Sequence, residues 1–373
     1  MDALMLPLNW QKVRLGDIGK PCMCKRVMKH QTTRYGEIPF YKIGTFGNTA
    51  DAFISKKLFL EYKTKYSFPK KGDILISASG TIGRAVIYDG KPAYFQDSNI
   101  VWIDNDETLV KNDFLFYAYS NVKWNTEYTT ILRLYNDNFR NTLIPLPPLN
   151  EQSAIANILS DLDRYLCALD ALILKKEGVK KSLSFELLSQ RKRLKGFNQA
   201  WQRVRLGDIA NYLTSNLSVE QITQQGEIKV YDVNNFIGYT DTTFISDKPY
   251  ISIVKDGSVG RVRILPPKTN ILSTMGALIA NHRTTTEFLF YLLSNFDFKN
   301  FTSGSIIPHI YFKDYKEKTI FLPPLNEQSA IANILSALDN EIASLKNKKR
   351  QFENIKKALN HDLMSAKIRV LEK

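Results

Sequence analysis

The segment "LPPLNEQSAIANILS", from Leu146 to Ser160, occurs twice in this chain and returns unchanged from Leu322 to Ser336. Two consecutive prolines lack amide donors and fix the φ angle, so each copy begins with an extended stretch. A helix is expected to follow, with Asn150 and Asn326 as its N-caps and a glutamate near its positive end. Each copy therefore predicts the passage from a globular module into a helix.

Apolar residues then recur at alternating spacings of four and three, which is typical of a coiled coil. The simplest partner of one helix is the other, running antiparallel in the same chain, and a dimer between chains is the alternative. Gly178 and several lysines interrupt the stripe, so we expect a loosened or locally distorted middle. The apolar positions are Ile155, Leu159, Leu162, Leu166, Leu169, Ile173, Leu183 and Leu187, and Ile331, Leu335, Leu338, Ile342, Leu345, Phe352, Leu359 and Leu363.

The repeat extends to the segments that precede the helices. "WQKVRLGDIGK" from Trp10 returns as "WQRVRLGDIAN" from Trp201, 191 residues later. "SGTIGR" from Ser79 returns as "DGSVGR" from Asp256, 177 residues later. The order is kept, which indicates a tandem duplication of a globular module and a helix. The smaller offset predicts a deletion in the second module between the positions of Lys57 and Ser79.

The composition favours a polyanionic partner. The 373 residues include 51 Lys and Arg against 37 Asp and Glu, a formal net charge of +14. Nucleic acid is the commonest such partner, and a generally basic proteome is the alternative explanation. No apolar run reaches the roughly 20 residues that span a membrane. The first residues lack a secretory signal pattern, and three cysteines form no disulfide framework, so we expect a cytoplasmic protein.

The modules are expected to be α+β with a mixed sheet. "GDILISASGTIGRAVIY" predicts a strand, a turn and a strand, whereas "DFLFYAYSNV" and "EFLFYLLSNF" predict short buried helices. The turn lacks the Gly-Lys-Ser/Thr end of a nucleotide-binding loop. Its hydroxyls and arginine suit contacts to a nucleic-acid backbone, and a simple hairpin is the alternative.

An insertion specific to the first module carries lysines between aromatic residues, which suits a DNA-facing loop. A solvated strand pair is the alternative. The candidate DNA-binding residues of both modules are Lys42, Lys63, Lys65, Lys70, Ser79, Thr81, Arg84, Arg133, Asn234, Asn235, Ser258, Arg261 and Ser305.

A coiled coil requires apolar seam positions, but it does not require identical polar residues. Their identity favours one kind of partner docked on both copies, and a recent duplication is the alternative. The candidate partner-binding residues are Asn150, Glu151, Gln152 and Asn157, and Asn326, Glu327, Gln328 and Asn333.

The sequence offers no catalytic set, cofactor motif or metal site. Glu61 and Lys63 match half of a metal-dependent nuclease signature, and Glu227 and Lys229 match it again. These triplets leave a DNA-cleaving enzyme as an alternative, and a coiled-coil scaffold with incidental basic charge is another. DNA turnover by the lone chain with Mg²⁺, abolished by Glu61→Ala, would favour the enzyme.

Taken together, the two "VRLGDI" openings, "KGDILIS" with "GTIGR", and the two Pro-Pro-x-x-Glu-Gln segments leading into heptad helices resemble the specificity subunits of type I restriction–modification systems. The resemblance implies two target recognition domains, residues 1–146 and 196–322, in a pseudo-twofold arrangement. It implies repeated helices in residues 147–195 and 323–373, which form an antiparallel coiled coil between the domains.

The resemblance also implies what the chain binds. Each domain would read one half of a bipartite double-stranded DNA target, and the coiled coil would fix the gap. Two copies of the modification subunit would dock on the repeated helices and methylate adenine, and a motor-nuclease restriction subunit would join for cleavage. The specificity subunit itself would not be catalytic.

Overall fold

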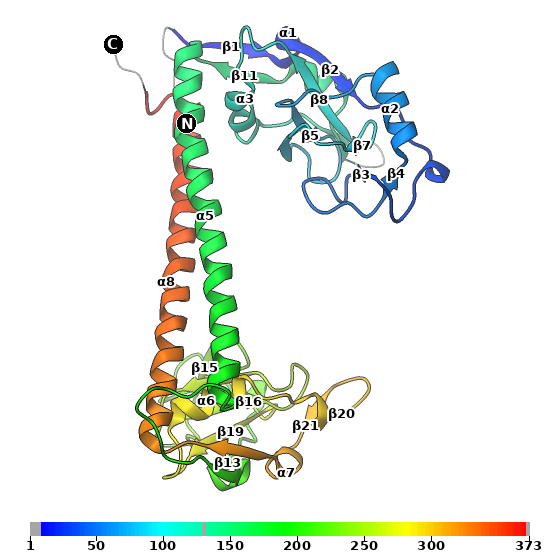
Figure 1. Cartoon of the computed structure of the whole chain (residues 1–373). Helices are drawn as coiled ribbons and strands as arrows, with labels where there is room; N and C mark the ends of the chain where they lie inside the picture. Colours follow the sequence, from blue (N-terminus) through cyan, green and yellow to red (C-terminus); the bar gives the residue numbers. More distant parts are fainter. Residues whose placement is uncertain (1–8, 129–131, 371–373) are drawn as a thin grey trace. The chain divides into compact units, whose positions relative to one another are not determined.

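The computed structural model describes residues 9–128 and 132–370, which form two compact units (Figure 1). The first unit contains the residues up to Leu169 and those from Lys348 onward, and the second contains the residues between them. Each unit holds one globular module and parts of two long helices, α5 (Leu149–Leu188) and α8 (Leu325–Met364). Each copy of the repeated segment therefore begins a helix in a different unit.

The first module contains two larger sheets, a closing strand pair and the two-stranded β9–β10 hairpin. The four-stranded sheet has the antiparallel order β2-β8-β5-β6, and in the sheet β4-β3-β7 the last pair is parallel. Strand β1 pairs with β11, so the start of the module lies beside the strand that leads into the repeated segment. The elements are β1 Gln11–Arg14, α1 Leu15–Ile18, β2 Gly19–Met23, η1 Lys29–Gln31, β3 Ile38–Tyr41, β4 Phe53–Ile54, α2 Lys56–Lys65, β5 Ile74–Ser77, β6 Ala85–Ile87, β7 Tyr94–Phe95, β8 Ile100–Asn105, α3 Asn112–Tyr119, β9 Glu127–Tyr128, β10 Leu132–Arg133, α4 Asn136–Asn141 and β11 Leu143–Leu146.

The second module repeats this plan. Its sheets have the orders β13-β19-β16-β17 and β15-β14-β18, its parallel pair is β14 with β18, and β12 pairs with β22. The elements are β12 Gln202–Arg205, η2 Leu206–Asp208, β13 Ala210–Thr214, η3 Val219–Gln221, β14 Ile228–Tyr231, β15 Phe236–Thr240, β16 Tyr250–Val254, β17 Val262–Leu265, β18 Thr269–Ile271, β19 Met275–Ala280, α6 Thr286–Ser294, η4 Lys299–Phe301, β20 Thr302–Ser303, β21 His309–Ile310, α7 Phe312–Tyr315 and β22 Thr319–Leu322.

These elements confirm the predicted α+β modules. Strands β5 and β6 flank the first glycine-rich turn, and α3 and α6 are the predicted buried helices. Helix α2 has no counterpart among the described residues of the second module, which accounts for the fall in offset. The insertion is therefore a helix followed by a loop that carries Phe68 and Lys70, rather than a strand pair.

Helices α5 and α8 pack on each other antiparallel in both units. In the first unit the ring of Tyr165 on α5 lies 4.7 Å from that of Phe352 on α8. In the second unit Lys176 pairs with Glu341 at 2.8 Å. The expected distortion is wrong, because α5 continues as a helix through Gly178 and the lysines pair with carboxylates. Among the described helices, none is long and apolar enough to cross a membrane.

The predicted N-caps are also misplaced, because the helices begin at Leu149 and Leu325, one residue before each asparagine, and the asparagines lie inside the first turn. The Asn150 side chain accepts a hydrogen bond from the backbone of the next residue at 3.0 Å, and Asn326 does the same at 2.9 Å. These amides satisfy one free backbone donor of the first turn from inside the helix.

A buried carboxylate joins the first module to both helices. Glu151, in the first turn of α5, is 2% exposed and accepts a hydrogen bond from the Trp10 indole at 3.0 Å. Arg369, which follows the end of α8, donates two further hydrogen bonds to Glu151 at 2.6 and 3.0 Å. We call this set of three residues the Trp–Glu–Arg cluster.

The second unit builds the same cluster from different parts of the chain. Glu327, in the first turn of α8, is fully buried and accepts from the Trp201 indole at 2.9 Å. Arg193, which follows the end of α5, donates at 3.2 and 2.6 Å. Before each arginine the chain turns through a residue in the left-handed region, Gln190 (φ 61°) or Ala366 (φ 57°). Both helices therefore end in the same turn, which returns an arginine to the start of the other helix.

The next residue of the repeated segment holds a second element of the module. Gln152 is fully buried, and its amide donates to the carbonyls of Leu109 and Pro147 at 2.9 Å each. Its oxygen accepts from the backbone of Lys111, the residue before α3, at 2.8 Å. In the second unit Gln328 makes the corresponding contacts with Arg283, Pro323 and Thr285 before α6.

A third repeated contact lies further along the helices, and we call it the Tyr–Asp–Lys cluster. Tyr117 of α3 donates to Asp163 of α5 at 2.8 Å, and Lys356 of α8 pairs with the same carboxylate. In the second unit the cluster consists of Tyr291, Asp339 and Lys180. Burial and the neighbouring carboxylate raise the pKa of both tyrosines, so the hydroxyls remain donors at physiological pH.

Removing the carboxylate of the second cluster should destabilise the chain. Glu327→Ala leaves the indole donor of Trp201 without an acceptor, and we expect a loss of about 3 kcal/mol in the free energy of unfolding. Glu327→Gln keeps an acceptor and should cost less. Glu341→Ala, on the same helix but exposed, is the matched control and should cost less than about 1 kcal/mol. Denaturant unfolding followed by circular dichroism measures all three, and equal losses for Glu327→Ala and Glu341→Ala would contradict the assignment.

Candidate nucleic-acid interface and docking face

In the first module, three predicted residues gather around the turn between β5 and β6. The backbone of Ser79 forms a bridge with Arg133 of β10, and the Ser79 hydroxyl donates to Asn99 at 2.8 Å. The Arg133 guanidinium donates to the carbonyl of Ser98 at 2.8 Å and to the Asn99 side chain. Thr81 lies exposed at the tip of the turn. These contacts join the turn to the β9–β10 hairpin.

Arg84 joins the same turn to a third loop. Its guanidinium donates to the carbonyl of Phe46 at 2.9 Å, within the loop of residues 42–48. Lys42 begins this loop and pairs with Asp51 at 2.8 Å. Five predicted residues of the first module therefore lie on three adjoining loops.

The second glycine of each turn has a structural role. Gly83 has a φ of +82°, and a Cβ there would lie 2.0 Å from the Trp124 ring. Gly260 has a φ of +79°, and a Cβ there would meet the Phe298 ring at 2.6 Å. Only glycine fits this conformation and this contact without strain. The glycine of the recurring Gly-Arg pair is therefore required by the shape of the turn, independently of any ligand.

The second module brings its predicted residues together in the same way. Arg261 donates to the side chain of Asn234 at 2.9 Å, which joins the turn to the loop of residues 232–235. The backbone N–H groups of Asn234 and Asn235 both donate to the Asp232 carboxylate. The turn also meets the β20–β21 hairpin, where the backbone of Gly257 donates to Pro308 at 2.9 Å. Ser258 on the turn and Ser305 on the hairpin are both exposed.

Each module therefore presents one turn, one hairpin and one further loop. Matching backbone bridges join the turn to the hairpin, and an arginine side chain joins the turn to the loop. The bridge between Ser79 and Arg133 corresponds to the bridge between Asp256 and His309. The side chains at these places differ in charge and in size. Such an arrangement can offer unlike chemical groups to two different DNA sequences from one scaffold.

Three residues of the second interface were missed by sequence reasoning. Arg263 lies over the Tyr231 ring at 5.2 Å and donates to the Asn234 carbonyl at 2.9 Å. His309 contacts Asp256 at 2.6 Å, and Ile306 at the hairpin tip is 93% exposed. Arg263 could have been predicted from its position in the sequence, two residues after the predicted Arg261.

The predicted lysines of the insertion form no hydrogen bond or ion pair with the three loops among the described residues. Lys63 lies over the rings of Phe59 and Phe68 at 5.6 and 5.3 Å, and those rings pack in the module core. Lys65 pairs with Glu61 on the exposed side of α2, and Lys70 pairs with Asp104. Phe59 and Phe68 therefore pack in the domain, whereas Tyr66 is exposed at the end of α2.

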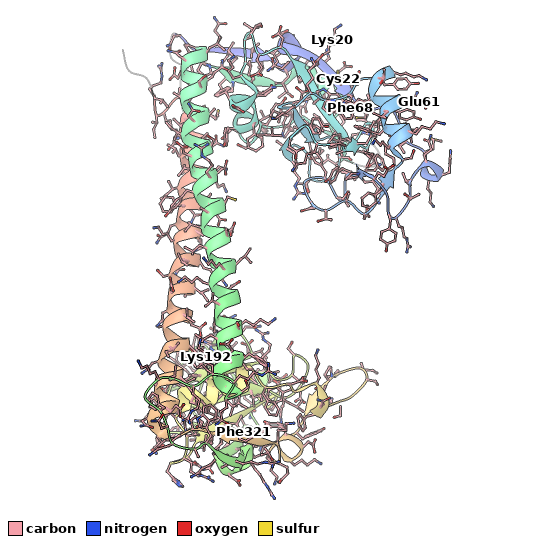
Figure 2. The ribbon with its side chains drawn as sticks, in the orientation of Figure 1. Lys20, Cys22, Glu61, Phe68, Lys192 and Phe321 are labelled. Atoms are coloured by element: carbon pink, nitrogen blue, oxygen red, sulfur yellow. The ribbon has the colours of Figure 1, made fainter. Side chains whose placement is uncertain are left out.

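Glu61, the candidate nuclease residue, projects from α2, whereas Phe68 lies over the body of the module (Figure 2). The described side chains include no group of three or more histidine, cysteine, aspartate or glutamate residues placed to hold a metal ion.

Four of the eight predicted partner-binding residues are buried inside their own unit. Glu151 and Gln152, and Glu327 and Gln328, are at most 2% exposed and hydrogen-bond within the chain. Their assignment to a partner surface is wrong for the folded chain. The fold itself explains why both copies keep these residues. In each unit the glutamate accepts from the tryptophan indole, and the glutamine contacts the backbone before α3 or α6.

The other four lie on an exposed face at the start of each helix. Asn150 and Asn157 are exposed on α5, and Asn326 and Asn333 occupy the same positions on α8. Neither the Asn157 nor the Asn333 side chain hydrogen-bonds to any residue in the described ranges. We call this surface the docking face of each helix. On α5 it consists of Leu149, Asn150, Ser153 and Asn157, and on α8 it consists of Leu325, Asn326, Ser329 and Asn333.

Comparison with known proteins agrees with this architecture. The family model for the type I restriction modification DNA specificity domain matches residues 7–176 and 198–354. The chain is 62% identical over 152 residues to a putative type I restriction enzyme specificity subunit of Haemophilus influenzae, a match that spans 40% of each chain. It is 26% identical over 414 aligned positions to the MjaVIII type I restriction enzyme specificity subunit of Methanocaldococcus jannaschii, which covers 99% of this chain and 95% of that one.

A solved structure shares the fold. The crystal structure of the type I restriction–modification system S subunit from M. genitalium matches with a TM-score of 0.64 and 20% identity, over 97% of this chain and 98% of that one. The two matched regions cover most of the sequence, and each contains one module with its turn, hairpin and loop. The chain therefore belongs to the family of type I restriction–modification DNA specificity domains and carries two of them.

Proposed function

We propose that this chain is the non-catalytic specificity subunit of a type I restriction–modification complex, and that each module reads one half of a bipartite double-stranded DNA target. The observation that supports the proposal is that the two units have the same buried clusters but different loops. The same buried clusters hold both modules on the helices, while the three loops of each module differ in sequence. One protein can thereby place two different readers on equal supports.

The helix pair would set the gap between the two half-sites. A heptad-repeat pair is stiff along its axis, and its length in residues converts directly into distance at 1.5 Å per residue. The paired lysines and carboxylates of α5 and α8, such as Lys176 with Glu341, support a register that does not slip. The gap would therefore be a property of the helices and not of the modules.

The docking face would receive two copies of the modification subunit, one at the start of each helix. Its exposed leucine offers an apolar contact, and Asn157 or Asn333 offers a side-chain amide with no hydrogen bond to a described residue, so both copies offer the same set. Equal surfaces require equal partners, which favours two identical subunits. A restriction subunit would join for cleavage, and methylation and cleavage would belong to these cytoplasmic partners.

The DNA-reading role of the second module is tested by Arg261→Ala. This change removes a guanidinium that contacts the adjoining loop, and we expect it to relax the preference at one half-site by about 1–3 kcal/mol. Arg84→Ala should do the same at the other half-site only. Binding of the assembled complex to a library of DNA duplexes measures both, and an equal effect of each variant on both half-sites would contradict the proposal.

The docking face is tested by arginine substitution. Asn333→Arg should remove one modification subunit from the complex, and Asn157→Arg combined with it should remove both, because a large charged side chain blocks the contact. Asn340→Arg is the matched control, since α5 already carries an exposed arginine, Arg164, at the corresponding position. Native mass spectrometry reports the stoichiometry, and two bound subunits on the double variant would refute this assignment.

The spacing role is tested by inserting one heptad into each helix. Seven residues add about 10 Å, or about three base pairs at 3.4 Å each, so the gap should grow by that amount. Sequencing of the methylated sites of the complex reports the gap and both half-sites. Altered half-sites with an unchanged gap would show that the helices do not act as a spacer.

A further inference from the structure

A basic hollow lies between the first module and helix α8, next to the glycine-rich turn. It has a volume of ≈ 900 Å³, and both residues of the recurring Gly-Arg pair, Gly83 and Arg84, line it. Helix α3 contributes another wall, and α8 lines it between Glu353 and His361. A predicted DNA-binding loop and the coiled coil therefore share one surface within this unit.

The charges in the hollow are not balanced. Lys356 is neutralised by Asp163 in the Tyr–Asp–Lys cluster, and Glu353 lies 3.5 Å from Lys349. The Arg84 guanidinium contacts a backbone carbonyl and no carboxylate of the described chain. Lys357 is exposed and forms no ion pair with a described residue. Two cations thus remain available for an anionic ligand.

The internal repeat shows which of the two neighbouring lysines on α8 has a structural role. Lys356 recurs as Lys180, and the tyrosine and aspartate that both contact explain this identity. Lys357 recurs as Lys181, which is also exposed and unpaired among the described residues. Nothing in the fold requires a lysine there, and the flanking helix positions have diverged, as His361 against Phe185 illustrates.

We propose that Lys357, which lines the same hollow as Arg84, and Lys181, its counterpart in the internal repeat, bind backbone phosphates of the DNA, so that the coiled coil is itself part of the DNA-binding surface. The proposal rests on the proposed function. The reading loops differ because they meet different bases, whereas the phosphate backbone is the same at every sequence. A lysine kept at the same helix position in both units, while the loops differ, is the pattern expected for contact with the phosphate backbone. Lysine binds phosphate as a point charge and carries no sequence information.

The experiment measures DNA affinity of the assembled complex against salt concentration. Each phosphate contact contributes about 0.9 to the slope of log affinity against log salt. Lys181→Ala with Lys357→Ala should lower that slope by about two and weaken target and scrambled duplexes by the same factor. Replacing both by arginine should restore the slope. Lys175→Ala is the matched control, because Lys175 is exposed on α5 and its counterpart on α8 is Gln351.

Three outcomes would overturn the proposal: an unchanged slope in the double alanine variant, an equal effect of Lys175→Ala, or loss of a modification subunit, which would place the lysines in the docking contact. The proposed function is judged separately, by whether the unaltered complex prefers its target over scrambled DNA. The salt slope on scrambled DNA tests the lysines even if that preference is absent.

Discussion

A buried carboxylate at the start of each long helix is the group on which the arrangement of each unit depends. Glu151 and Glu327 accept hydrogen bonds from an indole of the module and from an arginine that follows the other helix, so three distant parts of the chain meet at one side chain. Hydrogen bonds to a carboxylate are directional, and a buried carboxylate is costly unless all its partners are present. The module is therefore held in one orientation on its helices.

This constraint leaves the rest of each module free to diverge. The helix starts share a core with Trp10 and α3 in the first unit, and with Trp201 and α6 in the second. A separate core holds the remainder of each module, and in the first module it includes Phe59 of the insertion. Loss of α2 from the second module thus leaves the shared core and its hydrogen bonds intact. A specificity subunit can change its reading loops without changing how they are supported.

The sequence predicted those features that depend on local pattern. Proline pairs and heptad spacing act within a few residues, so the helices and their intramolecular pairing were predictable, as were the short buried helices. The roles of Glu151 and Gln152 were not, because their partners lie 141 and 41 residues away. Their identity in both copies was therefore interpreted as contact with another protein. The insertion was misread because Phe59, Tyr62 and Tyr66 also follow helical spacing, after the N-cap Ser55.

We propose that equal supports carry two unlike DNA-reading modules and that the helix pair sets the gap between the two half-sites. Sequencing of methylated adenines in a host that carries the complete system tests this most directly, because it reports both half-sites and the gap at once. The account predicts one bipartite target with two different half-sites and a single gap length. A continuous target, two identical half-sites or a variable gap would contradict it.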